Sequence, residues 1–212
     1  MFKLNFRLTV GVIILSIFVL GGIILPFFTQ EDPTSQGTYM RYLPMSGAHL
    51  LGTNALGQDI FWYLVFSIRN SLLLGVSVSL CTTVISTLVG LTAGYNGRWV
   101  DRVIMLITDS FITIPVLPIL ITLSTFVRGR SSFISVGLIL VAFGWAWNTR
   151  TVRAMALSVR EREFINMARF SGTSMFGIIT KEVFPYVYAY MVVGFINTIL
   201  YAINTEAALA VI

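Results

Sequence analysis

The sequence predicts an all-α, polytopic membrane protein, and three observations lead to this fold class. Hydrophobic residues make up 56% of the 212 residues and charged residues only 11%, whereas soluble domains carry roughly one quarter charged residues. The mean hydropathy is +0.85. Several long apolar runs reach or approach the roughly 20 residues that a helix needs to cross the hydrocarbon core of a bilayer.

We expect five of these runs to cross the membrane. They are residues 8–28, 71–94, 103–127, 133–149 and 185–205. The first run follows Lys3 and Arg7 as a secretory signal would. Its length, and the lack of a small-residue cleavage pattern before Pro26, favour a retained anchor.

Basic residues predict the orientation, because cytoplasmic loops are enriched in Lys and Arg. With the N-terminus inside, the inner segments carry ten of the 14 Lys and Arg residues and the outer segments carry four. We therefore expect a cytoplasmic N-terminus, with Trp99, Trp145 and Trp147 near the inner interface. The basic residues form no stripe along one polar face, which argues against nucleic-acid binding.

Small residues line the second expected crossing, and prolines interrupt the third. The small residues form two ladders at helical spacing: Gly75, Ser79, Thr83 and Thr87, and beside them Ser86, Gly90 and Gly94. They allow close helix packing, either within the chain or against another subunit. Pro115 and Pro118 remove backbone donors and should bend the third crossing near mid-membrane, to line a pathway or to fit a neighbouring helix.

The segment between the first two crossings, residues 29–70, is expected outside the membrane. Gly52 indicates a tight turn, and Asp59 is a candidate N-cap for a helix over residues 60–70. His49 has no partner at a fixed spacing in the sequence. We therefore interpret it as a structural or solvated residue, in preference to a ligand or a proton relay.

We expect no catalytic or metal site in this chain. It contains no phosphate-binding Gly-rich loop, and its single His and single Cys, Cys81, cannot supply a metal cluster or a hydrolase triad. Two isolated acidic residues belong to the crossings: Asp109 lies inside the third, and Glu206 lies at the end of the fifth. We interpret Asp109 as a buried hydrogen-bonding or capping residue near the inner boundary, in preference to a solute ligand. If transport is driven, its energy must enter from a separate protein.

Residues 161–185 contain a short charged helix with apolar residues on both sides. One arc of the helical wheel holds Phe164, Ile165, Ala168 and Gly172, and the opposite arc holds Met167 and Phe170 beside Glu163 and Asn166. Such a helix between two crossings has the geometry of a docking element. An interfacial helix anchored in the headgroup layer by Phe164 and Phe170 is an equal alternative on this evidence.

The segment FINMARFSG, followed by II and FP, resembles the cytoplasmic loop of ATP-binding-cassette importer permeases. That loop reads Glu-Ala-Ala, three residues, Gly, an Ile region and Leu-Pro. The matching positions are Ala168, Gly172, Ile178, Ile179 and Pro185. Asn166, Met167 and Phe184 replace the family's Glu, Ala and Leu. The resemblance implies an ATPase-coupling site formed by Phe164, Ile165, Asn166, Met167, Ala168, Arg169, Phe170, Gly172 and Pro185.

Three further segments are similar to the dipeptide, oligopeptide and nickel permease family, specifically its C-type subunit. They are HLLGTNALGQD at 49–59, GLTAGYNGRWVDRVIMLITDSFITIP at 90–115 and EAAL at 206–209. Asn54 and Gln58 depart from the family's Asp and Arg. The residues that we assign to helix packing or to the solute pathway are Gly90, Gly94, Asp109, Pro115, Pro118 and Glu206.

The resemblance implies the transmembrane domain of a type I ABC importer, with six crossings in the complete protein. Residues 1–70 would form an anchor and an extracytoplasmic segment, and residues 71–212 the permease core, with a coupling loop at about 150–185. Because family members continue past EAAL, we expect a C-terminally incomplete chain; a short natural variant is the alternative.

The same resemblance implies partners and a location. They are a second permease subunit, two cytoplasmic ATPase subunits that bind ATP and Mg, and an extracytoplasmic solute-binding protein, in the lipid of a prokaryotic inner membrane. This chain would bind no cofactor itself and would form half of a pathway for di- or oligopeptides. Oligosaccharides or nickel complexes are alternative solutes, and a freestanding channel or membrane scaffold is the alternative class.

Overall fold

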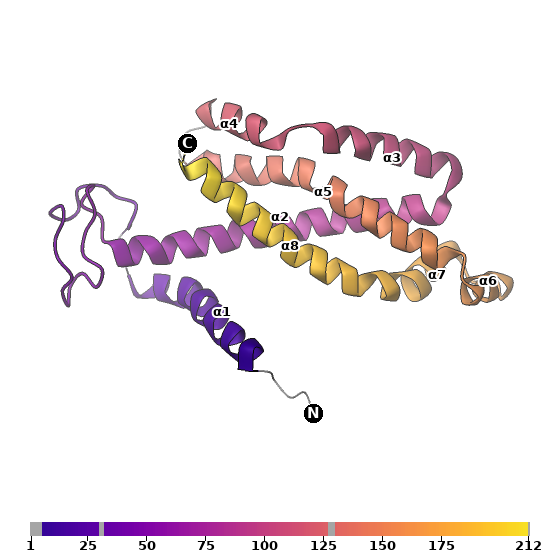
Figure 1. Ribbon diagram of the computed structural model, residues 1–212, viewed down its shortest axis with the longest axis horizontal. Coiled ribbons are helices and arrows are strands. Elements are labelled where there is room, and N and C mark those ends of the chain that lie inside the picture. Colours follow the sequence, from indigo (N-terminus) through magenta and orange to yellow (C-terminus); the bar gives the residue numbers. More distant parts are fainter. Residues whose placement is uncertain (1–5, 30–31, 127–129, 212) are drawn as a thin grey trace. The chain divides into compact units, whose positions relative to one another are not determined.

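In the computed structural model, the regular elements of the described part of the chain are all helical, which confirms the all-α class (Figure 1). The structure describes residues 6–29, 32–126 and 130–211. Two of the 14 basic residues counted for the orientation, Lys3 of the inner segments and Arg128 of the outer ones, lie outside these residues. The chain divides into two compact units, Met1–Leu73 and Leu74–Ile212, and the boundary between them falls inside helix α2.

The first unit contains helix α1 (Phe6–Ile24), the 3₁₀ helix η1 (Leu25–Phe28), a long loop and the beginning of α2 (Ile60–Asn96). Helix α1 and η1 together cover the first expected crossing. Gly22 is buried where α1 meets α2, and a Cβ atom there would lie 2.8 Å from Cγ2 of Ile68. A larger residue at this position would therefore push the two helices apart.

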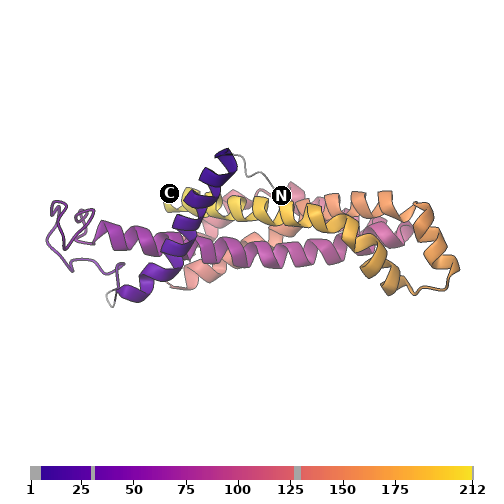
Figure 2. The same ribbon diagram turned by 90° about the horizontal axis from the view of Figure 1, so that it is seen from below.

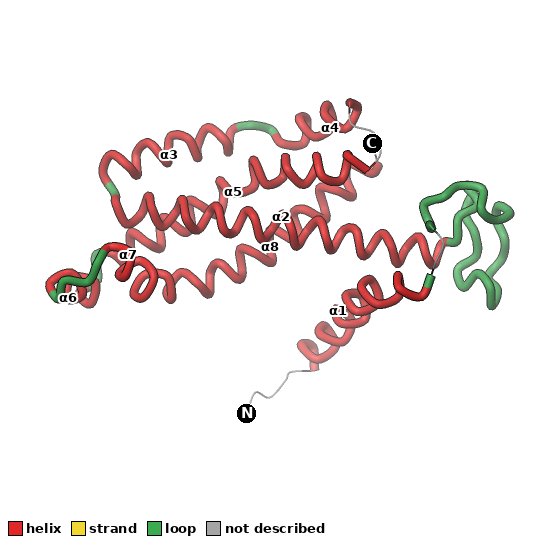
Figure 3. Tube along the Cα trace, turned by 180° about the vertical axis from the view of Figure 1, so that it is seen from behind, coloured by secondary structure: helices red, strands yellow, loops and turns green. Residues whose placement is uncertain are grey.

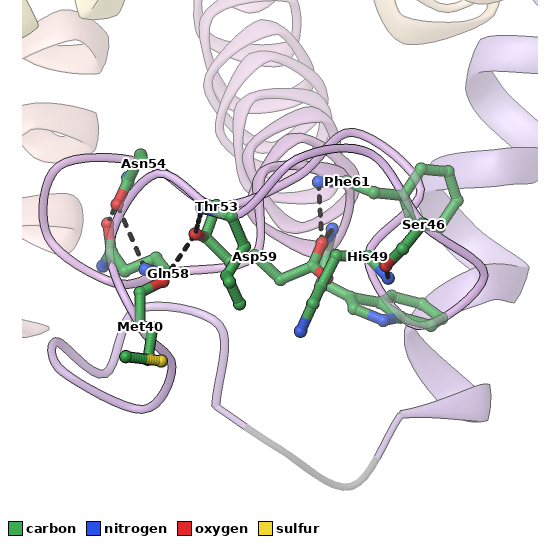
Figure 4. Close-up of polar contacts among 10 residues, drawn as sticks. Met40, Ser46, His49, Thr53, Asn54, Gln58, Asp59 and Phe61 are labelled. Atoms are coloured by element: carbon green, nitrogen blue, oxygen red, sulfur yellow. Dashed lines mark hydrogen bonds and ion pairs between the residues drawn. The ribbon is translucent and has the colours of Figure 1, made fainter.

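Hydrogen bonds within the long loop hold the start of α2 (Figure 4). Oδ1 of Asp59 accepts from the backbone N–H groups of Phe61 at 2.9 Å and Trp62 at 3.2 Å, which confirms the predicted N-cap. Oδ2 of Asp59 lies 2.8 Å from Nδ1 of His49. The side chain of His49 is only 12% exposed, so His49 is not a solvated residue, and the sequence did not reveal its partner.

Helix α2 begins at Ile60 and continues without interruption to Asn96. The predicted helix over 60–70 and the predicted crossing over 71–94 are therefore one helix. The physical reason is that Asp59 caps the first turn and none of the 37 residues of α2 is a proline that would end the helix.

The Asp59→Ala substitution is expected to fray the first turn of α2 and lower its stability by about 1–2 kcal/mol, because two backbone N–H groups lose their acceptor. Hydrogen exchange of the Phe61 and Trp62 amides measures this effect. Asp32→Ala is the matched control, since Oδ1 of Asp32 accepts from the N–H of Thr34 in an exposed turn. Unchanged exchange at Phe61 in Asp59→Ala would contradict the capping role.

The second unit is built from the rest of α2 and the helices that follow it (Figures 1 and 2). These are α3 (Arg98–Thr113), α4 (Val116–Phe126), α5 (Arg130–Arg160), α6 (Glu163–Phe170), α7 (Met175–Ile178), the π-helix η2 (Ile179–Val183) and α8 (Phe184–Val211). Two buried clusters hold this unit together. One joins α2 and α5–α8 and includes Leu91, Val152 and Ile165, and the other includes Leu74, Leu120 and Leu140.

Helices α3 and α4 are bent by 60° at Ile114 and Pro115, which confirms the predicted bend (Figure 3). Pro115 stands in the break itself, whereas Pro118 lies in the first turn of α4, where a missing N–H costs little. The bend therefore belongs to Pro115. The predicted end of this crossing, residue 127, lies outside the described residues.

Three helical segments in the described part of the chain are long and apolar enough to cross a membrane, and the bent pair α3–α4 would be a fourth. The three are Phe6–Phe28, Ile60–Asn96 and Met175–Leu209. Helix α5, which covers the expected crossing at 133–149, is not among them. The structure thus supports a polytopic helical membrane protein with three or four candidate spans.

Candidate functional site

Helix α6 lies beyond the ends of α5 and α8 in the second unit (Figure 1). Its Ile165 is fully buried, with 0% of its surface exposed, in the cluster that also contains Val152 of α5 and Val187 of α8. Phe164 and Ala168 pack against the same cluster. One of the two predicted apolar arcs is therefore the face by which α6 is attached to the rest of the protein.

The opposite arc of α6 is exposed. The side chain of Phe170 is 91% exposed and that of Met167 is 68% exposed. Large apolar groups this exposed at the tip of a helical unit need a partner, either a protein surface or a lipid surface. We call Met167 and Phe170 the exposed face of α6.

Two aromatic contacts fix α6 in place. The ring of Phe164 stacks on the ring of Tyr186 with centroids 5.3 Å apart, and the guanidinium of Arg169 lies 5.3 Å from the centroid of the Tyr95 ring. Phe164 thus packs within the protein. The interfacial alternative requires Phe164 to be an exposed headgroup anchor, which it is not. These contacts tie α6 to the start of α8 and the end of α2.

Gly172 does not lie on the buried arc, contrary to the wheel analysis, because α6 ends at Phe170. The φ of Gly172 is +78°. Its N–H donates to the carbonyl of Arg169 at 3.0 Å, and the N–H of Thr173 donates to the carbonyl of Ala168 at 3.1 Å. This is the Schellman helix ending, which favours glycine at this position. The glycine of the motif therefore terminates the helix.

Pro185 lies in the first turn of α8, directly after the π-helix η2. The backbone N–H of Phe184 donates to the carbonyl of Ile179, five residues earlier. Pro185 has no N–H to donate, so the chain cannot continue the ordinary i to i−4 pattern through this point. The continuous helical segment formed by α7, η2 and α8 thus contains a π-helical turn, a feature that is frequent at functional sites.

Gly90 and Gly94 form the contact between α2 and α5. A Cβ atom on Gly90 would lie 2.7 Å from Cβ of Val152, and one on Gly94 would lie 2.6 Å from Cβ of Ala156. The sequence left two interpretations of this ladder, packing within the chain or against another subunit. For these two glycines, the structure shows packing within the chain. Gly75 of the other ladder faces Ile199 and Ile203 of α8.

Two ion pairs join α3 to α5. Asp101 accepts two hydrogen bonds from Arg153, and this contact raises the pKa of the Arg153 guanidinium above its usual value. Oδ1 of Asp109 lies 2.6 Å from Nη2 of Arg150. The prediction of a buried Asp109 is wrong, because its side chain is 52% exposed. Its hydrogen-bonding role is confirmed, and an arginine on a different helix stabilises its charge.

Glu206 lies inside α8, so the EAAL segment does not follow the helix but forms part of it. Its Oε2 is buried and makes no hydrogen bond within the described residues.

Side chains that could bind a metal ion do not cluster in the described part of the chain. No three His, Cys, Asp or Glu side chains come together in residues 6–29, 32–126 and 130–211.

Sequence reasoning missed the polar residues Asn148 and Asn197, which lie on α5 and α8 beside the α3–α4 break. An amide in the middle of an apolar helix is the signal that could have identified them, since polar residues in membrane helices commonly face other helices or a cavity. Phe176 was also missed as an exposed apolar residue, although it lies close to α6 in the sequence.

Comparison with known proteins adds independent information. Residues 86–212 match the family described as binding-protein-dependent transport system inner membrane component. The oligopeptide transport system permease protein OppC of Mycobacterium tuberculosis is 35% identical over 167 residues, which are 79% of this chain and 57% of that protein. OppC of Lactococcus lactis subsp. lactis is 31% identical over 175 residues, 82% of this chain and 59% of that protein.

The chain thus spans less than two thirds of the length of these relatives. The family match begins within α2 and covers α3 to α8. It therefore includes the bend at Pro115, the contact glycines Gly90 and Gly94, and the whole of α6.

Proposed function

Because this chain belongs to the family of binding-protein-dependent transport system inner membrane components, we propose that it is a permease subunit of an ATP-driven peptide importer. The family expected from the sequence is confirmed by this match. The observation that carries the functional proposal is α6, which buries Ile165 in the core and leaves Met167 and Phe170 exposed. A helix attached on one side and apolar on the other is suited to receive force from a partner protein.

The partners proposed are those that this type of importer requires. A second permease subunit completes the pathway, two cytoplasmic ATPase subunits bind ATP and Mg, and an extracytoplasmic binding protein delivers the solute. The ATPase subunits contact the exposed face of α6. Their movement reaches the membrane helices through Ile165 and the stacked pair Phe164 and Tyr186, and one subunit rocks against the other to alternate access.

The chain is proposed to cross the prokaryotic inner membrane five times with a cytoplasmic N-terminus. In this arrangement α5 forms the fourth crossing over 133–149. The distribution of Lys and Arg supports the orientation. Residues 1–70 then serve as anchor and extracytoplasmic segment, and residues 71–212 as permease core with the coupling loop at about 150–185.

Peptides are the proposed solutes, because the relatives are named as oligopeptide permeases. The packing residues Gly90 and Gly94, the bend at Pro115 and the ion pair of Asp109 shape the half-pathway contributed by this chain. An importer of oligosaccharides or nickel complexes would share this architecture, so the solute must be tested separately from the coupling.

A cross-linking experiment tests the coupling proposal. In a Cys81→Ala background, Phe170→Cys is expected to form a cross-link with a nucleotide-hydrolysing subunit in membranes of the host. The matched control is Tyr42→Cys, which replaces an aromatic side chain that is 75% exposed and lies in the extracytoplasmic segment. Capture of the ATPase by Tyr42→Cys alone, or purification of a complex that hydrolyses no nucleotide, would contradict the proposal.

A further inference from the structure

A cavity of about 260 Å³ lies beside the break between α3 and α4. We call it the amide pocket. The residues that line it and carry the argument are Phe111, Phe143, Trp147, Asn148, Asn197 and Tyr201. They come from α3, α5 and α8, so the pocket is formed where a broken helix faces two continuous ones.

Several polar groups of the amide pocket lack a partner within the described part of the chain. The Asn197 amide and the Trp147 indole N–H make no hydrogen bond there. Asn148 donates from Nδ2 to Oγ1 of Thr198 at 3.1 Å, which leaves its Oδ1 as an acceptor. Asn197 and Trp147 are both exposed in the chain, so inside a membrane their polar groups are stable only where water or another polar molecule reaches them. The pocket is therefore suited to hold a polar molecule.

Among the described residues, those that line the amide pocket include no charged side chain. The charged groups nearest in sequence, Asp109 and Arg150, neutralise each other in their ion pair. An ionised group in the pocket would lack a counterion, which is unfavourable in a membrane protein. The part of the ligand that enters must then be uncharged but able to donate and accept hydrogen bonds, as a peptide amide does.

The aromatic residues of the amide pocket supply apolar surface beside its polar groups. Phe111 and Phe143 have ring centroids 5.7 Å apart and offer apolar surface without specific hydrogen bonds. Such a surface accepts side chains of different size and shape. Broken helices line solute pathways in other transporters because the break exposes groups to the cavity.

We propose that the amide pocket is where this chain contacts the backbone of the transported peptide, with Asn148 and Asn197 hydrogen-bonding its amide groups. This inference rests on the proposed function and names the contact surface within it. The pocket is slightly smaller than typical sites for drug-sized ligands, which start at about 300 Å³. It would therefore hold a short stretch of an extended chain at any one time.

Thiol accessibility in the full complex tests this inference. In membrane vesicles with a Cys81→Ala background, Asn197→Cys is expected to react with the permanently charged reagent 2-(trimethylammonium)ethyl methanethiosulfonate. Its matched control is Ile196→Cys, on the same helix, exposed in the chain but outside the pocket lining. We expect Asn197→Cys to react roughly ten times faster, because a charged reagent and a reactive thiolate both require water.

Peptide should compete with the reagent. Tri-alanine, added with binding protein and MgATP, is expected to slow the labelling of Asn197→Cys, and maltotriose should have no effect. Asn197→Leu should raise the KM for tri-alanine uptake roughly tenfold, as expected for one lost buried hydrogen bond, while Ile196→Leu should leave it unchanged.

Two results would overturn the inference without touching the proposed function. One is labelling of Asn197→Cys no faster than that of Ile196→Cys, which would mean that protein or lipid fills the pocket. The other is a normal KM in Asn197→Leu. Failure of the unmodified complex to take up peptides of any length would refute the proposed function itself, and the inference with it.

Discussion

The Phe170→Lys substitution is expected to abolish ATP-driven uptake while the protein still folds and inserts. Phe170 is 91% exposed in the chain and belongs to neither buried cluster. Its replacement therefore changes the free energy of unfolding little. Lysine in the last turn of α6 also suits the helix dipole. In a docked complex, however, the same change removes an aromatic anchor and buries an unpaired charge.

Loss of a central interface residue costs about 2–4 kcal/mol, which corresponds to roughly 30-fold or more weaker binding. Uptake by vesicles and the amount of ATPase that copurifies measure this loss. Phe170→Leu is the control, because leucine keeps an apolar side chain at the same position and should retain most uptake. Normal uptake and normal ATPase content in Phe170→Lys would refute docking through the exposed face of α6.

The second large effect is expected where α2 and α5 are in closest contact. A Cβ atom at Gly94 would lie 2.7 Å from the carbonyl oxygen of Arg153, and one at Gly90 would lie 2.9 Å from that of Thr149. Backbone atoms cannot move aside as a flexible side chain can. Each Gly→Val substitution should therefore destabilise the protein by about 1–3 kcal/mol through overpacking.

The double variant Gly90→Val/Gly94→Val is expected to lose most folded protein from the membrane. Thermal stability of each single variant in detergent, followed by fluorescence-detected size exclusion, measures the individual costs. Gly11→Ala is the matched control, because no atom lies within 4 Å of a Cβ built at Gly11 in α1. A Gly94→Val variant as stable as the unmodified protein would show that α5 can shift to accommodate the side chain.

Local patterns predicted those features that depend on neighbours in the sequence. The two apolar arcs of α6 were predicted because a helical wheel follows from a constant rotation per residue. The helix bend was predicted because Pro115 lacks a donor wherever it stands. The N-cap at Asp59 was predicted because a cap acts on residues two and three positions away.

Two of the errors arose because the partner of the residue lies on another segment of the chain. Asp109 was expected to be buried, but Arg150 of another helix pairs with it in a half-exposed position. His49 was considered alone, but the loop folds back so that Asp59 reaches it. Gly172 was placed on the arc of α6 because the wheel does not show where a helix ends.

The sequence by itself determined that this is a helical membrane protein with a two-faced helix between its last apolar segments, because hydropathy and helical spacing are properties of consecutive residues. Only the tertiary structure decided which arc of α6 is buried, which helix Gly90 and Gly94 face, and that Asn148 and Asn197 line one pocket beside the break. Those contacts join α2, α3, α5 and α8, and their geometry exists only once helices remote in the sequence have packed together.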